Sequence, residues 1–190
     1  MAEAMVIGDK RPAPQQTKAE VATPDSRTIE EVCAQLGVTA DRVVKTLIVH
    51  GETEDGKPTL VAILLRGDKM LNTIKAEKIK GVESPLRMAT DAEIRDALGC
   101  ETGSIGPVGL SIPVIADRSV VNMADFVTGA NRTGFHLTGV NWERDAQYNV
   151  VADVRDVVEG DPSPDGKGNL LIKRGIEVGH IFQLGTKYSK

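Results

Sequence analysis

Two apolar runs rich in β-branched residues stand close together in the first half of the chain, at residues 41–50 and 59–66. A polar segment that contains glycine and proline, residues 51–58, separates them. Short apolar runs bounded by turn-forming residues are typical of β-strands. The pattern therefore predicts a β-hairpin.

Three helices are predicted from periodicity and from start and stop signals. Residues 28–37 begin with a Thr-x-x-Glu capping box, continue with apolar residues at i, i+3, i+4 and i+7, and end at a glycine. Residues 90–99 begin with the same spacing and also end at a glycine. The third helix is predicted over residues 71–79, with Leu71, Ile74 and Ile79 on its apolar side and the lysines at 75, 78 and 80 outside.

The rest of the chain predicts shorter elements. A strand is expected near residues 112–116 and another over 150–158, whereas 120–127 and 135–140 each fit a strand or a short helix. Residues 1–24 lack apolar periodicity, so regular structure is expected to begin at Thr28. Hairpins mixed with short helices predict an α+β fold with a mixed, mostly antiparallel sheet or barrel, and not a doubly wound sheet.

Composition narrows the class of protein. A net charge of −4 over 190 residues argues against a protein that binds nucleic acid through bulk positive charge, although a local basic patch stays compatible with it. The two cysteines have no CxxC partner and the three histidines are scattered, so neither a disulfide framework nor a metal ligand set is readable. The N-terminus lacks the apolar segment of a signal peptide, and no apolar stretch is long enough to span a membrane, which predicts a cytoplasmic protein.

Lys45 is the first candidate for chemistry, because it lies inside the apolar run 43–49. Lysine is almost never fully buried without a partner. A cation in mid-strand therefore either sits at an edge with its ammonium in water, or is directed at an anionic ligand. The glycine-rich segment 103–109 is a second candidate, since glycines let backbone N–H groups approach a carbonyl oxygen closely. The residues alone leave these alternatives open.

Several short motifs, in the right order, resemble the insertion (editing) domain of bacterial-type prolyl-tRNA synthetases, a relative of the YbaK-type deacylases. The tail at residues 172–189 resembles the stretch by which these enzymes re-enter their class II catalytic core. The resemblance implies a linker at 1–24, an editing domain at 25–159 and a return segment at 160–190. The motifs are Ala22-Thr23-Pro24, Arg27-Thr28-Ile29, Val44-Lys45-Thr46-Leu47, Leu65-Arg66-Gly67-Asp68, Gly106-Pro107 and Gly139-Val140-Asn141-Trp142.

The resemblance also implies which residues form the site. Lys45, with Thr46 beside it, would engage the tRNA 3′ end through charge-assisted hydrogen bonds. Ile29 and Val32 would line an alanine-sized pocket; the family often has leucine at the second position, and the smaller valine would loosen the size limit. His136 would orient the aminoacyl group or a water as a neutral imidazole, although a lone histidine is more often structural.

Further residues would assist the reaction. Asp117 would fix the alanine ammonium or brace the glycine loop, and a structural N-cap is the alternative. Gly103, Gly106, Pro107 and Gly109 would bring backbone dipoles to the oxyanion while a positioned water attacks the ester, with help from a ribose hydroxyl. No Ser-His-Asp arrangement is readable and neither cysteine has an evident base, so a covalent acyl-enzyme is not expected.

The function that the resemblance implies is hydrolysis of alanine mischarged onto tRNA(Pro), within a proline–tRNA ligase. A synthetic site built for proline excludes a smaller amino acid poorly, because a missing methylene is worth only about 1–3 kcal/mol. The alternatives are a free-standing trans-editing deacylase specific for cysteine and a non-catalytic tRNA-binding insertion. Editing is expected to need no cofactor or metal, with ATP and Mg²⁺ confined to the synthetic site. The expected partners are the alanylated 3′ end of tRNA(Pro) and the remainder of a homodimeric synthetase.

Overall fold

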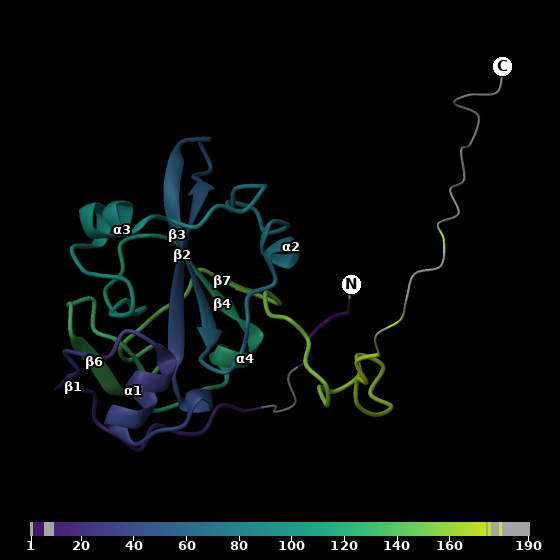
Figure 1. Cartoon of the computed structure of the whole chain (residues 1–190), viewed down its shortest axis with the longest axis horizontal. Coiled ribbons are helices and arrows are strands. Elements are labelled where there is room, and N and C mark those ends of the chain that lie inside the picture. The colour runs from purple at the N-terminus through teal and green to yellow at the C-terminus, as the bar shows by residue number, and fades with distance from the viewer. Residues whose placement is uncertain (1, 6–9, 174, 176–178, 180–190) are drawn as a thin grey trace.

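The computed structural model describes residues 2–5, 10–173, 175 and 179 (Figure 1). The described strands form a three-stranded sheet of order β1-β6-β5 and a four-stranded sheet of order β2-β3-β4-β7. The elements are, in chain order, β1 (Ala19–Ala22), α1 (Ile29–Leu36), the 3₁₀ turn η1 (Ala40–Arg42), β2 (Val44–Glu52), β3 (Pro58–Arg66), α2 (Thr73–Ala76), α3 (Asp91–Leu98), β4 (Val114–Asp117), α4 (Arg118–Val121), β5 (Phe126–Gly129), β6 (Phe135–Val140) and β7 (Val150–Ala152).

The predicted α+β fold class is confirmed. Strands β2 and β3 form the predicted antiparallel hairpin, and β6 pairs antiparallel with both β1 and β5. Strands β4 and β7 join the four-stranded sheet in parallel, so this sheet is mixed. Across the described residues the strands stay in two separate sheets, and of the two predicted forms the open one is correct.

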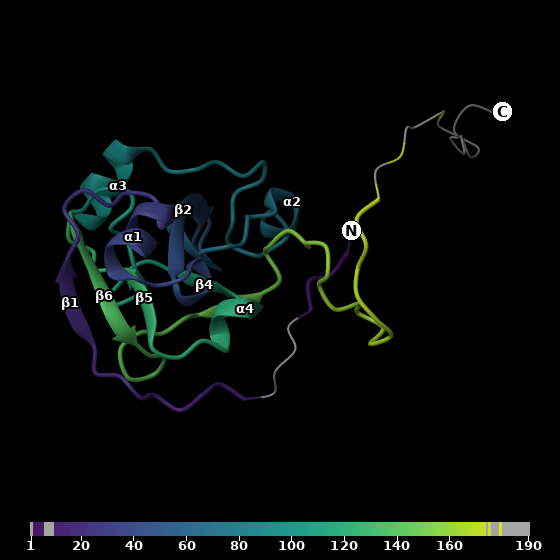
Figure 2. The ribbon, with the colours of Figure 1, turned by 60° about the horizontal axis from the view of Figure 1, so that its bottom comes forward.

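Strand β3 lies at the centre of the core because both of its faces are covered. On one face, Leu64 belongs to the same buried cluster as Phe126 of the three-stranded sheet. On the other face, Ile63 shares a second cluster with Ala76 of α2 and with Val154. The layers therefore run from the three-stranded sheet, through the main core and the four-stranded sheet, to α2 and the segment after β7 (Figures 1 and 2).

Helices α1 and α3 confirm the predictions made from capping boxes. In each helix the N-cap threonine and the glutamate three residues later satisfy each other's backbone N–H groups, and a left-handed glycine ends the helix. The buried face of α1 packs through Val32 onto Val43 and Val127. Because Val43 precedes β2 and Val127 belongs to β5, α1 covers the place where the two sheets meet.

The helix predicted over residues 71–79 is wrong in length, and its predicted face is correct for Leu71, Ile79, Lys78 and Lys80 but wrong for Ile74 and Lys75. Only Thr73–Ala76 is helical, Ile74 is 56% exposed, and Ala76 is the buried residue. The side chain of Lys75, predicted to lie outside, is only 9% exposed because its Nζ pairs with Asp153 at 2.9 Å. Local periodicity does not contain this ion pair, whose partner lies 78 residues later.

Other boundaries also differ from the prediction. Regular structure begins at β1 and not at Thr28, because residues 19–22 pair with residues 135–138 of β6. Residues 120–127 contain the end of α4 and the start of β5, and 135–140 form β6 in full. The strand predicted over 150–158 ends at Ala152, since the chain beyond it leaves β4 and pairs only through an isolated antiparallel bridge between Arg155 and Leu71, beside side-chain contacts.

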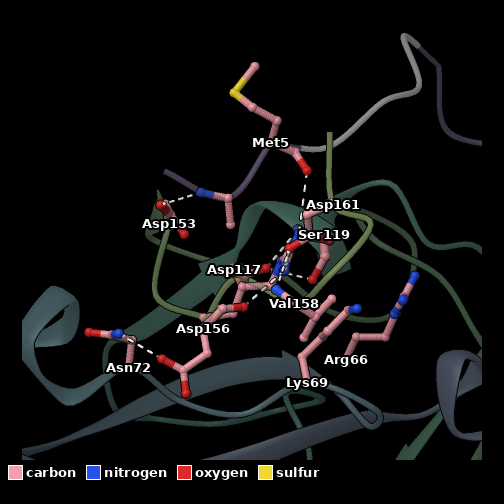
Figure 3. Close-up of polar contacts among 12 residues, drawn as sticks. Met5, Arg66, Lys69, Asn72, Asp117, Ser119, Asp153, Asp156, Val158 and Asp161 are labelled. Atoms are coloured by element: carbon pink, nitrogen blue, oxygen red, sulfur yellow. Dashed lines mark hydrogen bonds and ion pairs between the residues drawn. The ribbon is translucent and has the colours of Figure 1, made fainter. Parts of the chain in front are cut away.

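Residues 153–161, which we call the strap, follow β7 and are fixed to the body by polar contacts (Figure 3). The N-terminal residues 2–5 lie on the strap, so the segments before and after the two-sheet body lie side by side. The contacts of the strap are Lys75–Asp153, Asn72–Asp156, Arg155–Asp161, Val154–Asp117, Ala4–Asp153 and Arg155–Met5. Within the described ranges, no helix has the length and apolar character needed to cross a bilayer.

Candidate active site

A cavity of about 210 Å³, which we call the α1–β2 cavity, opens beside α1, the start of β2 and the glycine loop. Larger cavities of about 520 and 590 Å³ lie elsewhere, but the smaller one gathers a cation, a hydroxyl and an imidazole. Its volume is below the roughly 300–1,000 Å³ of pockets for drug-sized ligands, and suits a group of amino-acid size. It brings together six of the ten residues predicted for the site: Ile29, Val32, Lys45, Thr46, Gly103 and His136.

Lys45 is half-buried at the wall of this cavity. Its Nζ donates a hydrogen bond to the carbonyl of Gly67, just after β3, at 3.2 Å. Burial lowers the pKa of Lys45, while the carboxylates of Asp68 and Glu30 act in the opposite direction. An ammonium has three donors, and within the described part of the chain the Gly67 carbonyl is the acceptor that Nζ has. The remaining donors can therefore serve an anionic or carbonyl ligand.

Thr46 places an unsatisfied hydroxyl in the same lining. Its Oγ1 is buried and has no hydrogen-bond partner among the residues that the structure describes. Leaving such a group unpaired costs about 1–3 kcal/mol, so a buried polar atom of this kind calls for a specific explanation. Thr46 lines the α1–β2 cavity, but its hydroxyl oxygen has almost no accessible surface, so a ligand would reach it only where the lining moves.

His136 is held by Thr23, a residue that the sequence analysis noted only within a motif. The Oγ1 of Thr23 and the Nδ1 of His136 lie 2.6 Å apart, and both residues are buried. Burial lowers the pKa of His136, and the backbone of Gly103 opposes this shift. The imidazole is therefore neutral near pH 7, with one nitrogen donating and the other accepting. The hydrogen bond with Thr23 fixes the orientation of the ring in the cavity wall.

Protonation of His136 should destabilise the fold. Because burial holds its folded-state pKa below the ordinary value of 6.5, its contribution to stability is complete above that pH and is lost as the pH falls through the folded-state pKa. Thermal unfolding measured from about pH 7.5 to about pH 5 should show a steeper decline for wild type than for His136→Asn, whose amide does not titrate there. Equal slopes for the two proteins would contradict this expectation.

The glycine loop contributes only part of what was predicted. Gly103 lines the α1–β2 cavity together with Ile105, whereas Pro107 and Gly109 line the cavity of about 520 Å³. In the described part of the chain, no acceptor takes a hydrogen bond from the backbone N–H of Gly103 or Ile105. These two N–H groups are therefore available to donate to a ligand in the α1–β2 cavity.

Gly106 is packed into the protein and its N–H is already used. This N–H donates to Oδ1 of Asn131 at 2.8 Å. A Cβ at Gly106 would lie 2.0 Å from the carbonyl oxygen of Gly129, so only glycine fits. Gly106 thus sets the path of the loop and does not face the ligand.

Asp117 lies on the strap side of the molecule, at the end of β4 (Figure 3). Its Oδ1 accepts from the N–H of Ser119 at 2.9 Å, and its Oδ2 accepts from the N–H of Val154 at 3.1 Å. The first contact is the N-cap of α4, and the second fixes the strap. The structure does not bring Asp117 to the α1–β2 cavity, and its contacts are those of the structural alternative.

Neither cysteine has the environment of a nucleophile. Burial raises the pKa of Cys33 and of Cys100, which disfavours the reactive thiolate. Among the described residues, no group of three or more His, Cys, Asp or Glu side chains could hold a metal ion. The groups available around the α1–β2 cavity are therefore an ammonium, a hydroxyl, a neutral imidazole and backbone N–H groups, which can bind and polarise an ester.

Comparison with known proteins points to the same part of the chain. A family model for an aminoacyl-tRNA editing domain matches residues 23–146, which include Thr23 and the lining residues named above. The chain resembles the crystal structure of a hypothetical protein at 29% identity and a TM-score of 0.56, with 74% of this chain and 92% of that chain covered.

Two further solved structures share the fold. One is a proposed trans-editing enzyme for prolyl-tRNA synthetase, at 23% identity and a TM-score of 0.55, with 74% of this chain and 87% of that chain covered. The other comes from computational grafting of epitopes onto scaffold proteins, at 18% identity and a TM-score of 0.58, with 74% and 88% covered. At these identities the likeness shows the fold alone.

Proposed function

Because the chain belongs to the family of aminoacyl-tRNA editing domains, we propose that it hydrolyses alanine from mischarged tRNA(Pro). The observation that carries this proposal is the α1–β2 cavity, where Lys45, Thr46 and His136 surround a space of amino-acid size. The charge of Lys45 suits the phosphate and ribose oxygens at the tRNA 3′ end.

Discrimination between amino acids would come from the apolar wall of the cavity. Ile29 and Val32 belong to one face of α1, and Val32 is only 1% exposed. This wall would admit alanine and exclude the larger ring of proline, with the size limit loosened by the valine at position 32. Such a sieve complements a synthetic site that cannot reject the smaller amino acid by missing contacts alone.

The proposed reaction is attack by water on the ester carbonyl. The water oxygen forms a bond to the carbonyl carbon, the bond to the ribose oxygen breaks, and one water proton ends on that oxygen. The backbone N–H groups of Gly103 and Ile105 would stabilise the oxyanion, His136 would orient the aminoacyl group or the water, and a neighbouring ribose hydroxyl would assist. Free alanine and tRNA with an intact 3′ hydroxyl are the products, and the step needs no cofactor or metal.

We further propose that the domain acts in cis, within a cytoplasmic, homodimeric prolyl-tRNA synthetase. In that protein residues 1–24 and 160–190 would connect to the catalytic core, where ATP and Mg²⁺ are used. The side-by-side arrangement of residues 2–5 and the strap supports this, because an inserted domain must receive and return the chain at neighbouring points. Residues 174, 176–178 and 180–190 of the proposed return segment lie outside the described residues.

The proposal is tested by deacylation of alanyl-, prolyl- and cysteinyl-tRNA(Pro). Wild type should hydrolyse the alanyl ester and spare the prolyl ester. Val32→Ala widens the wall and should raise hydrolysis of prolyl-tRNA(Pro) by about 10–100-fold, the range that one or two methylenes are worth in such a pocket. Preference for the cysteinyl ester would favour the trans-editing alternative, and binding without any hydrolysis would favour the non-catalytic one.

A further inference from the structure

Asn131 makes three hydrogen bonds to the glycine loop, residues 103–109. It lies in the turn between β5 and β6, and its side chain reaches the loop in two directions. Oδ1 accepts from the N–H of Gly106 at 2.8 Å, and Nδ2 donates to the carbonyl of Val108 at 2.8 Å. Its backbone N–H donates to the carbonyl of Ser104, also at 2.8 Å.

These attachments alternate with the residues of the loop that line the cavity. Residues 104, 106 and 108 are bound to Asn131, whereas Gly103 and Ile105 face the α1–β2 cavity. Asn131 therefore fixes Ser104 and Gly106, the residues on either side of Ile105, and Ser104 also directly follows Gly103. These bonds thereby limit where the N–H groups of Gly103 and Ile105 can lie.

The backbone of the loop is also pressed against β5. A Cβ at Gly129 would lie 2.3 Å from the carbonyl carbon of Ser104. The hydroxyl of Ser104 accepts from the N–H of Gly134 at 3.1 Å, at the far end of the same turn. The loop and the turn therefore form one unit, and His136 follows on the strand that leaves this turn.

We propose that Asn131 is a positioning residue for the hydrolysis, acting through the glycine loop. It would hold the N–H groups of Gly103 and Ile105 within hydrogen-bonding reach of the oxyanion and at a fixed position relative to His136. This inference rests on the proposed function. Asparagine meets both requirements of the position, since it tolerates the positive φ of 54° found here and carries a donor and an acceptor on one amide.

Two substitutions separate the side chain from the backbone. Asn131→Gly keeps the positive φ and removes both side-chain hydrogen bonds, and Asn131→Asp keeps the acceptor for Gly106 but loses the donor to Val108. Asn131→Gly should lower kcat for alanyl-tRNA(Pro) by about 10–100-fold with KM within about threefold of wild type, because small misplacements of catalytic groups cost this much. The kcat of Asn131→Asp should lie between those of wild type and Asn131→Gly.

The control is Glu143→Gly, at another non-glycine residue of positive φ, 62°, outside the loop. It should leave kcat unchanged, and thermal unfolding of every variant separates lost positioning from lost folding. Amide hydrogen exchange gives a readout without activity, since the Gly106 amide should exchange faster in Asn131→Gly than in wild type.

The outcomes separate this inference from the proposed function. If wild type is active and both Asn131 variants keep kcat within about threefold of it, the positioning role is wrong and the proposed function stands. Unchanged exchange at Gly106 in Asn131→Gly would likewise overturn the role. If wild type hydrolyses no aminoacyl-tRNA, the proposed function is wrong, while the exchange data still report whether Asn131 holds the loop.

Discussion

Replacing Lys45 by alanine should lower kcat/KM for alanyl-tRNA(Pro) by about 10–150-fold. A hydrogen bond to a charged group is worth about 1.5–3 kcal/mol, and each 1.36 kcal/mol corresponds to a factor of about ten. Among the residues that the structure describes, the ammonium is anchored by one carbonyl, that of Gly67, so its charge and remaining donors are available to the tRNA 3′ end. Because this contact exists before and during the reaction, most of the loss should appear as a higher KM.

Lys80→Ala is the matched control for Lys45→Ala. It removes the same charge, but from a side chain that is 87% exposed and paired only at the surface with Glu54. Both variants change the net charge equally, so a loss shared by both would report general electrostatic attraction of tRNA. Lys45→Arg should recover part of the activity, because it keeps the charge with a different geometry. Activity of Lys45→Ala within about threefold of wild type would rule out the proposed role.

The sequence predicted the part of the site that is local in the chain. Ile29 and Val32 are one helical turn apart on a helix with clear start and stop signals, and Lys45 and Thr46 are neighbours on the hairpin that follows. Periodicity placed the first pair on one helix face, and the resemblance to editing domains named all four as site residues. The shared cavity confirms that these residues lie together, while their roles in the reaction stay predictions.

The contacts that hold the site were not predictable in this way. The hydrogen bond between Thr23 and His136 joins residues 113 apart, and the one between Asn131 and Gly106 joins residues 25 apart. A short sequence motif identifies a residue but not the distant residue to which it hydrogen-bonds. Asp117 shows the converse, because the resemblance suggested a site residue whereas its contacts are with Ser119 and Val154.

The same distinction applies to the fold. The hairpin and the two capped helices were predicted because their determinants are turns, caps and periodic apolar residues within a few positions. The length and face of α2 and the end of β7 depend on the strap, which binds Lys75 and Asn72 from a distant part of the chain. Asp161, which the resemblance assigns to a return segment, is buried in an ion pair with Arg155 within the strap. A long-range ion pair such as Lys75–Asp153 leaves no local pattern.

Replacing Arg155 by methionine should lower the free energy of unfolding by about 3–5 kcal/mol, the usual cost of removing one partner from a buried ion pair. Arg155 and Asp161 are 3% and 8% exposed, and the guanidinium donates to the carboxylate at 2.6 Å. Urea unfolding at pH 7 measures the loss. Arg27→Ala is the control, because its ion pair with Glu101 is exposed and worth about 0–1 kcal/mol.

The pH dependence and a double variant identify the cause of that loss. Burial alone would raise the pKa of Asp161, but hydrogen bonds from Arg155 and from the N–H of Val158 hold it below its ordinary value. The stability that depends on this carboxylate is present above about pH 4 and is lost as the pH falls through the folded-state pKa. The penalty of Arg155→Met should therefore shrink in acid, where Asp161 becomes neutral.

Adding Asp161→Asn to Arg155→Met should recover part of the lost free energy of unfolding at pH 7, since no unpaired charge then remains buried. A double variant as unstable as Arg155→Met at pH 7 would instead assign the loss to packing of the arginine side chain against the strap.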